Sequence, residues 1–129
     1  MSETAGSLTT SVTAFVEAMR ALVPIVQRPS DWSPLERFVA TDEFERVGTF
    51  AEKMEWAGYL EMLTRWATAT DEFDTTVRRI SEVPGLVYYE VEERHRRGPH
   101  VHLVNTLTVF GFTSAGEIRR LDVYMQQPG

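Results

Sequence analysis

The chain has 129 residues and a formal net charge of -6, and hydrophobic residues make up 43% of it. This length and composition are typical of one globular domain with a well-formed core. The excess of acidic residues disfavours nucleic acid and anionic membranes as partners. Because the chain has no cysteine, disulfides, Cys-based zinc sites and thiolate nucleophiles are excluded.

The first ten residues lack the basic and then apolar pattern of a secretion signal, and no run reaches the roughly 18 apolar residues of a membrane span. We therefore expect a cytoplasmic protein without a membrane partner. Residues 1–9 are mostly small and polar, so we expect a disordered N-terminal segment there. A single domain is expected over residues 10–127.

Three helices are predicted in the first half of the chain. Val12, Phe15 and Met19 recur at helical spacing, and Pro24 ends that run. Ser33–Glu36 reads as a capping box with proline at the first helical position, so a second, short helix is expected to begin there. The third helix has one wide apolar stripe, made of Trp56, Tyr59, Leu60, Leu63, Trp66 and Ala67.

The second half of the chain is predicted to be a sheet. Asp42–Phe50 reads as a brief strand or an irregular extended segment. Four successive strands follow the third helix, namely Phe73–Ile80, Leu86–Arg94, Val101–Phe112 and Ile118–Met125. Helices followed by antiparallel strands predict an α+β fold, in which a curved antiparallel sheet carries three N-terminal helices on its concave face. Such an arrangement tends to leave a concave interior for a small molecule.

The alternation of side chains along the strands assigns them to two faces of the sheet. Val87, Tyr89 and Val91 share one face of their strand. Both faces of Val101–Phe112 are substantially apolar, so neither is simply solvated. One face should contact the helices, and the other is expected to contact a second copy of the chain. We therefore expect a homodimer formed through the outer face of the sheet.

Three helices, a curved sheet and a Gly-x-Ile-x-x-Leu-x-x-Tyr ending over Gly116–Tyr124 resemble the nuclear transport factor two-like superfamily, and within it the SnoaL-like proteins. The resemblance implies a cone-shaped interior beneath the helices. The superfamily includes isomerases, dehydratases, cyclases and epoxide hydrolases, besides members without catalysis. The fold therefore does not select one activity.

The catalytic residues of two such enzyme types are not matched. Where ketosteroid isomerases have a tyrosine, an aspartate base and an aspartic acid, this chain has Phe15, Val47 and Thr108. Limonene epoxide hydrolases need an Arg-x-Asp where this chain has Arg94–Arg96, and a second aspartate one residue away from Asp122. A shift of one residue moves a strand side chain to the other face. Asp122 is therefore assigned to an ion-pair network on the outer face.

Glu45 is the first candidate for a proton carrier. If Glu45, Val47 and Thr49 point inward, aromatic rings enclose the carboxylate, and desolvation raises its pKa as a general acid or base requires. The alternative is a glutamate at the rim, paired with an arginine. His102 is a second candidate acid or base. His100 and His102 could share a metal only with a third ligand, and none is identifiable, so no metal and no cofactor is expected.

Rings and hydroxyls between the third helix and the final strands are the candidate ligand contacts, and the alternative is that they only fill the core. These residues are Trp56, Tyr59, Trp66, Tyr89, Thr106, Thr108, Phe110 and Val123. The basic cluster Arg94–Arg97 is expected to be solvated at a hairpin tip.

The sequence thus predicts a protein that binds a small, largely apolar molecule in an interior pocket. The resemblance adds cofactor-independent acid/base chemistry of the isomerase, dehydratase, cyclase or hydrolase type. The alternative is a non-catalytic dimeric module that binds a partner protein or sequesters a ligand.

Overall fold

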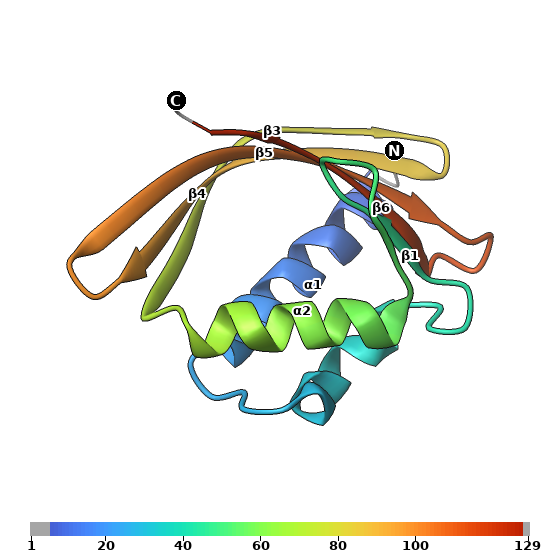
Figure 1. The fold of residues 1–129 in the computed structure, drawn as a ribbon. Helices are drawn as coiled ribbons and strands as arrows, with labels where there is room; N and C mark the ends of the chain where they lie inside the picture. Colours follow the sequence, from blue (N-terminus) through green and yellow to red (C-terminus); the bar gives the residue numbers. More distant parts are fainter. Residues whose placement is uncertain (1–5, 128–129) are drawn as a thin grey trace.

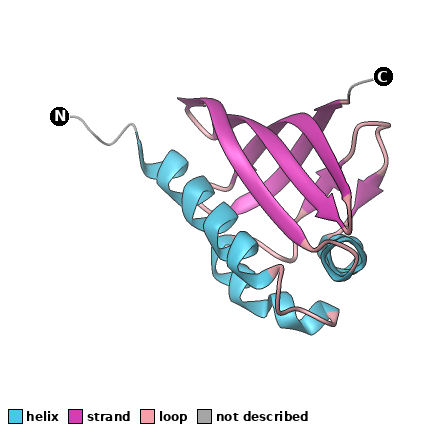
Figure 2. Cartoon of the chain, turned by 90° about the vertical axis from the view of Figure 1, so that its left-hand side faces the viewer, coloured by secondary structure: helices cyan, strands magenta, loops and turns pink. Residues whose placement is uncertain are grey.

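A six-stranded, strongly curved sheet carries the helices on its concave side (Figures 1 and 2). The structure is a computed structural model that describes residues 6–127. The helical elements are α1 (Ser7–Leu22), the 3₁₀ helix η2 (Pro29–Phe38) and α2 (Trp56–Thr68). The strands are β1 (Glu45–Val47), β2 (Lys53–Met54), β3 (Glu72–Val83), β4 (Leu86–Arg97), β5 (His100–Phe112) and β6 (Ile118–Gln126).

The strands lie in the order β2-β1-β6-β5-β4-β3. Strands β3 to β6 are consecutive antiparallel neighbours, as the sequence predicts. Strand β1 adds to the far edge in parallel with β6, and β2 pairs with β1 in the antiparallel sense. The expected α+β cone is therefore confirmed, and its sheet is wider and mixed because the segment after η2 joins it.

The core lies between the concave face and the helices. Phe15 of α1 meets Phe38 and Phe110 edge to face, with ring centroids 6.0 and 6.1 Å apart. Trp32 and Leu35 of η2 are fully buried. In Figure 1 the sheet arches over α1 and α2. The hairpin between β4 and β5 forms the left end of this arch, and the hairpins between β3 and β4 and between β5 and β6 form the right end. Within residues 6–127, no helix has the length and apolar character needed to cross a membrane.

The second helix differs from its prediction in type and start. It is a 3₁₀ helix that begins at Pro29 rather than at Ser33. Asp31 accepts hydrogen bonds from the backbone N–H groups of Gln27 and Arg28 at 2.9 and 3.2 Å, which fixes the earlier start. The Gln27 bond is the main cause that lowers the pKa of Asp31. Pro34 lacks the N–H that an α-helix would require inside this segment.

Helix α1 also begins earlier than expected. It starts at Ser7, so residues 7–9, assigned above to the disordered segment, are helical, and residues 1–5 lie outside the described part. Glu82 of β3 accepts hydrogen bonds from the backbone N–H and the hydroxyl of Thr9, at 2.9 and 2.7 Å. The carboxylate thereby caps an N–H group that the helix itself leaves unpaired. This contact fixes the start of α1 on the sheet.

The replacement Glu82→Gln should lower the melting temperature by a few degrees at neutral pH, because the charged cap is lost. The hydroxyl of Thr9 is the first cause that lowers the pKa of Glu82. Because the pKa of Glu82 is lower in the folded protein than in the unfolded chain, where it is about 4.3, ionised Glu82 stabilises the fold at pH values above about 4.3. This stabilisation is lost as the pH falls through the pKa of Glu82 in the folded protein. The two proteins should therefore melt at similar temperatures at about pH 3.

Glu61→Gln is the matched control, because Glu61 is an exposed helical glutamate on α2. Thermal melts of the three proteins across pH measure the effect. An equal loss at neutral and acidic pH would contradict the charged-cap interpretation.

Candidate functional site

A cavity of about 290 Å³ lies between the helices and the concave face of the sheet. Side chains from α1, β1, α2 and the four long strands line it, and most of the lining surface is apolar. The rings and hydroxyls predicted as ligand contacts line this cavity, except for Trp56. They are Tyr59, Trp66, Tyr89, Thr106, Thr108, Phe110 and Val123.

Trp56 belongs to the core and not to the cavity wall. Its indole meets the ring of Phe44 edge to face at a centroid distance of 5.0 Å and lies 5.9 Å from the ring of Tyr59. Trp56 is the first residue of α2 and 8% exposed. The periodicity of the apolar residues correctly identified the buried face of α2. It could not show that Phe44 packs against the first residue of this helix, whereas later residues of the same face line the cavity.

The expectation that Glu45 points inward is wrong. Strand β1 pairs with β6 in a register that places Glu45 beside Arg120 and Arg46 beside Leu121. Glu45 Oε1 accepts a hydrogen bond from Arg120 Nη1 at 3.0 Å on the outer face, so the alternative of an arginine-paired glutamate holds. Asp122 binds the same guanidinium at 2.9 and 3.0 Å, as predicted. The alternation of β1 turns Arg46 inward instead.

A hydrogen-bond chain at the cavity wall links α2 to β4. Trp66 Nε1 donates to His95 Nδ1 at 3.0 Å, and His95 Nε2 lies 3.0 Å from Glu93 Oε1. An indole N–H can only donate, so His95 Nδ1 must accept, and the imidazole proton resides on Nε2 and is donated to the carboxylate. The two hydrogen bonds therefore orient the Glu93 carboxylate through the neutral imidazole of His95.

Aromatic contacts hold the imidazole of His95 in place. Its ring centroid lies 5.1 Å from that of Phe73 and 5.7 Å from that of Trp66, and those two rings meet edge to face at 4.8 Å. The side chains of His95 and Glu93 are 20% and 23% exposed. The prediction that the basic segment around His95 is entirely solvated is therefore wrong for this residue.

Sequence reasoning missed Glu93 and His95, although a signal for them was present. They continue the alternation of Val87, Tyr89 and Val91 along the same strand, so they share the inward face. The expected strand ended at Arg94, whereas β4 continues to Arg97. Continuing the alternation from Val91 to Glu93 and then to His95 would have placed both residues in the interior.

Two tyrosine hydroxyls complete the polar part of the wall. Burial is the main cause that raises the pKa of Tyr59 well above its ordinary range. The charge of Arg46 lowers that pKa and the charge of Glu93 raises it, so both charges act on the Tyr59 hydroxyl. Burial also raises the pKa of Tyr89. Both phenols therefore stay protonated near neutral pH and can donate hydrogen bonds.

His102 does not line the main cavity. It lines a second hollow of about 620 Å³ that shares Trp66, Glu93 and His95 with the cavity. The register pairs His102 with His95 across β4 and β5. Among residues 6–127 no group of three or more His, Asp or Glu side chains is arranged to hold a metal ion.

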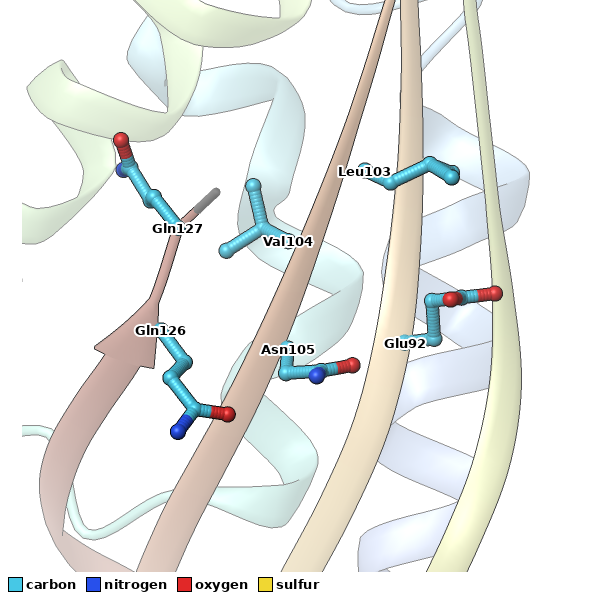
Figure 3. Close-up of a pocket in the computed structure, with 6 residues that line it drawn as sticks. All are labelled: Glu92, Leu103, Val104, Asn105, Gln126 and Gln127. Atoms are coloured by element: carbon cyan, nitrogen blue, oxygen red, sulfur yellow. The ribbon is translucent and has the colours of Figure 1, made fainter. Parts of the chain in front are cut away.

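The outer face carries a polar row over three neighbouring strands. Figure 3 shows Glu92, Asn105 and Gln126 on β4, β5 and β6, beside a shallow hollow between β5 and the end of β6. The register pairs Glu92 with Asn105 and Asn105 with Gln126. This row crosses an otherwise apolar stripe, to which Tyr88, Leu103 and Tyr124 contribute exposed surface.

Solved structures share this fold at low sequence identity. An NTF2-like protein from Anabaena variabilis ATCC 29413 matches with a TM-score of 0.78 and 11% identity over 100% of this chain and 96% of its own. A proposed SnoaL-like polyketide cyclase from Shewanella denitrificans OS-217 matches with a TM-score of 0.75 and 12% identity over 92% and 90%. An LEH-like epoxide hydrolase from M. tuberculosis matches with a TM-score of 0.66 and 16% identity over 91% and 84%.

No protein-family model and no curated protein matches the sequence. The structural matches show that the chain has the nuclear transport factor two-like fold of SnoaL-like proteins, as the resemblance of its sequence predicted. At these identities the similarity extends to the fold alone.

Proposed function

We propose that this protein binds a small, largely apolar molecule in its cavity and catalyses a proton transfer on it, with Glu93 as the base. The observation that carries the proposal is the Glu93 carboxylate, which lines an otherwise mostly apolar cavity and accepts a hydrogen bond from His95. One donor leaves the carboxylate with free lone pairs for a substrate proton. Its orientation by His95 supports a defined direction of proton transfer.

The proposed reaction begins at a carbon beside a carbonyl group. Glu93 removes a proton from that carbon, and the electron pair of the C–H bond moves to the carbonyl oxygen and forms an enolate. The protonated hydroxyl of Tyr59 donates a hydrogen bond to this oxygen. Where the substrate carries a carbon–carbon double bond at the β,γ position, the enolate is a dienolate. Return of the proton from Glu93 to the γ carbon then restores the carbonyl, moves the double bond into conjugation with it and regenerates the base. Because Trp66 occupies Nδ1, His95 positions Glu93 and does not relay the proton.

The size of the cavity limits the substrate. A volume of about 290 Å³ lies at the lower end of the roughly 300–1,000 Å³ of ligand pockets, which suits a molecule of one or two rings. The proposed polyketide cyclase of the same fold fits this chemistry, because polyketides carry C–H groups beside carbonyls. The enolate described above would also be the nucleophile of a ring closure.

The replacement Glu93→Gln should slow the reaction by about 10²–10⁴-fold, because the amide cannot take up the proton. The bicyclic ketone beta-tetralone is a suitable probe, and NMR in deuterium oxide measures the enzyme-dependent exchange of its acidic C–H protons. Glu92→Gln is the matched control, since Glu92 is the neighbouring carboxylate on the opposite face of β4. The Glu92→Gln variant should exchange the C–H protons of beta-tetralone at the wild-type rate.

Equal exchange rates for wild-type protein and Glu93→Gln would remove Glu93 from the reaction. Binding of beta-tetralone without faster exchange would contradict catalysis and favour the alternative of a ligand-sequestering module.

We further propose that two copies of the chain associate through the outer face of the sheet. Exposed apolar side chains gather there, with Val101 44%, Leu103 43% and Tyr124 58% exposed. Arg120 with Glu45 and Arg79 with Glu90 provide both signs of charge around them. Such a surface complements a second copy of itself about a two-fold axis. The side-chain amides of Asn105 and Gln126 in the polar row can both donate and accept hydrogen bonds, so they can pair with the same amides of a second copy.

A charge on the apolar stripe should therefore separate the copies. Leu103→Glu should be monomeric at concentrations where the wild-type protein is dimeric, as measured by analytical ultracentrifugation. Ile25→Glu is the control, because Ile25 is 67% exposed in the loop after α1, outside this face. A wild-type monomer at high concentration would refute the proposed dimer.

A further inference from the structure

We infer that the molecule bound in the cavity carries a carboxylate and that Arg46 binds it. This inference rests on the proposed function of the cavity as a ligand site and adds the chemical class of the ligand. Arg46 lies on β1, where the register with Leu121 turns its side chain toward the interior. It lines the cavity, and its guanidinium carbon lies 6.0 Å from the ring centroid of Tyr59.

The guanidinium of Arg46 has no anionic partner within residues 6–127: neither an ion pair nor a hydrogen bond to a carboxylate is formed there. Its sheet neighbour Arg120, by contrast, binds Glu45 and Asp122 on the outer face. The ring of Tyr59 offers the half-buried Arg46 side chain a cation–π contact, but its N–H groups have no hydrogen-bonding contact within residues 6–127. A ligand carboxylate would supply that contact, since a guanidinium can bind it with two parallel, charge-assisted hydrogen bonds.

The charges that face the cavity also orient such a ligand. The titratable side chains of its wall are Arg46, Tyr59, Tyr89, Glu93 and His95. The two phenols are protonated and the imidazole is neutral, so one positive and one negative charge remain. Both act on the Tyr59 hydroxyl, and they act with opposite signs.

A ligand carboxylate is attracted by Arg46 and repelled by Glu93. The ligand therefore lies with its carboxylate toward β1 and its apolar body toward Glu93. The reacting carbon is consequently remote from the carboxylate. The structure thus favours apolar acids that carry a separate carbonyl group as substrates.

Two probes of nearly the same shape, beta-naphthoate and beta-naphthamide, test this inference by isothermal titration calorimetry. The wild-type protein should bind the carboxylate about tenfold or more tightly than the amide, as a charge-assisted contact predicts. Arg46→Met keeps the length of the side chain and removes its charge, so this preference should disappear while binding of the amide persists. Arg37→Met is the control, because Arg37 lies on η2 over the Phe38 ring and does not line the cavity.

Equal affinity of the wild-type protein for the two probes would overturn the assignment of Arg46, as would an unchanged preference in Arg46→Met. Neither result would affect the exchange of the neutral ketone at Glu93, so the proposed function would stand. If neither probe binds and beta-tetralone does not bind, the cavity is not a ligand site and both proposals fail.

Discussion

The hydrogen-bond chain from Trp66 through His95 to Glu93 is the interaction on which the candidate site depends. It joins the helix α2 to the concave face of the sheet at the wall of the cavity. The indole N–H fixes which imidazole nitrogen accepts, and the other nitrogen then fixes the carboxylate. Without these hydrogen bonds, nothing within residues 6–127 would hold the Glu93 carboxylate in place at the cavity wall. With them, one carboxylate oxygen is held against the His95 ring at the wall of the cavity.

Alternation along the strands divides the charged residues between two tasks. On β1, Glu45 joins Arg120 and Asp122 in an outer-face network, while the adjacent Arg46 faces the cavity. On β4, Glu92 lies on the outer face and Glu93 on the inner one. Ion pairs on the outside are exposed and contribute little to stability. The two inward charges are separated from any such network, which leaves them available to a bound molecule.

The sequence was sufficient for most of the fold. Strong periodicity in α2 and in the four long strands predicted elements that the structure contains, because long amphipathic segments carry many repeats of the same signal. Strand β1 has only Glu45–Val47, too short for alternation to decide which side chain faces inward. The match of Val47 to the base position of ketosteroid isomerases suggested the wrong face for Glu45. Only pairing with β6, which is distant in sequence, settles its register.

The candidate site was predicted only in part, because local periodicity places some of its residues and contacts between distant segments place the others. The rings and hydroxyls on α2 and β5 followed from periodicity, whereas Trp56 required knowledge of Phe44 on a loop outside the pattern. His95 was assigned to a solvated hairpin tip because two arginines follow it before Gly98. Strand β4 nevertheless continues past it, and the indole of Trp66 accounts for its inward position. A contact between a helix and a strand this far apart in sequence has no local signature.

The protonation of the His95 ring tests the central claim most directly. Two-dimensional ¹H–¹⁵N NMR of the labelled imidazole distinguishes the nitrogen that carries the proton from the one that accepts. The account predicts a neutral ring with the proton on Nε2 in the wild-type protein, and a mixture of tautomers in Trp66→Phe. Trp56→Phe should keep the wild-type pattern, because the Trp56 indole makes no hydrogen bond within residues 6–127. A wild-type ring with its proton on Nδ1 would contradict the account.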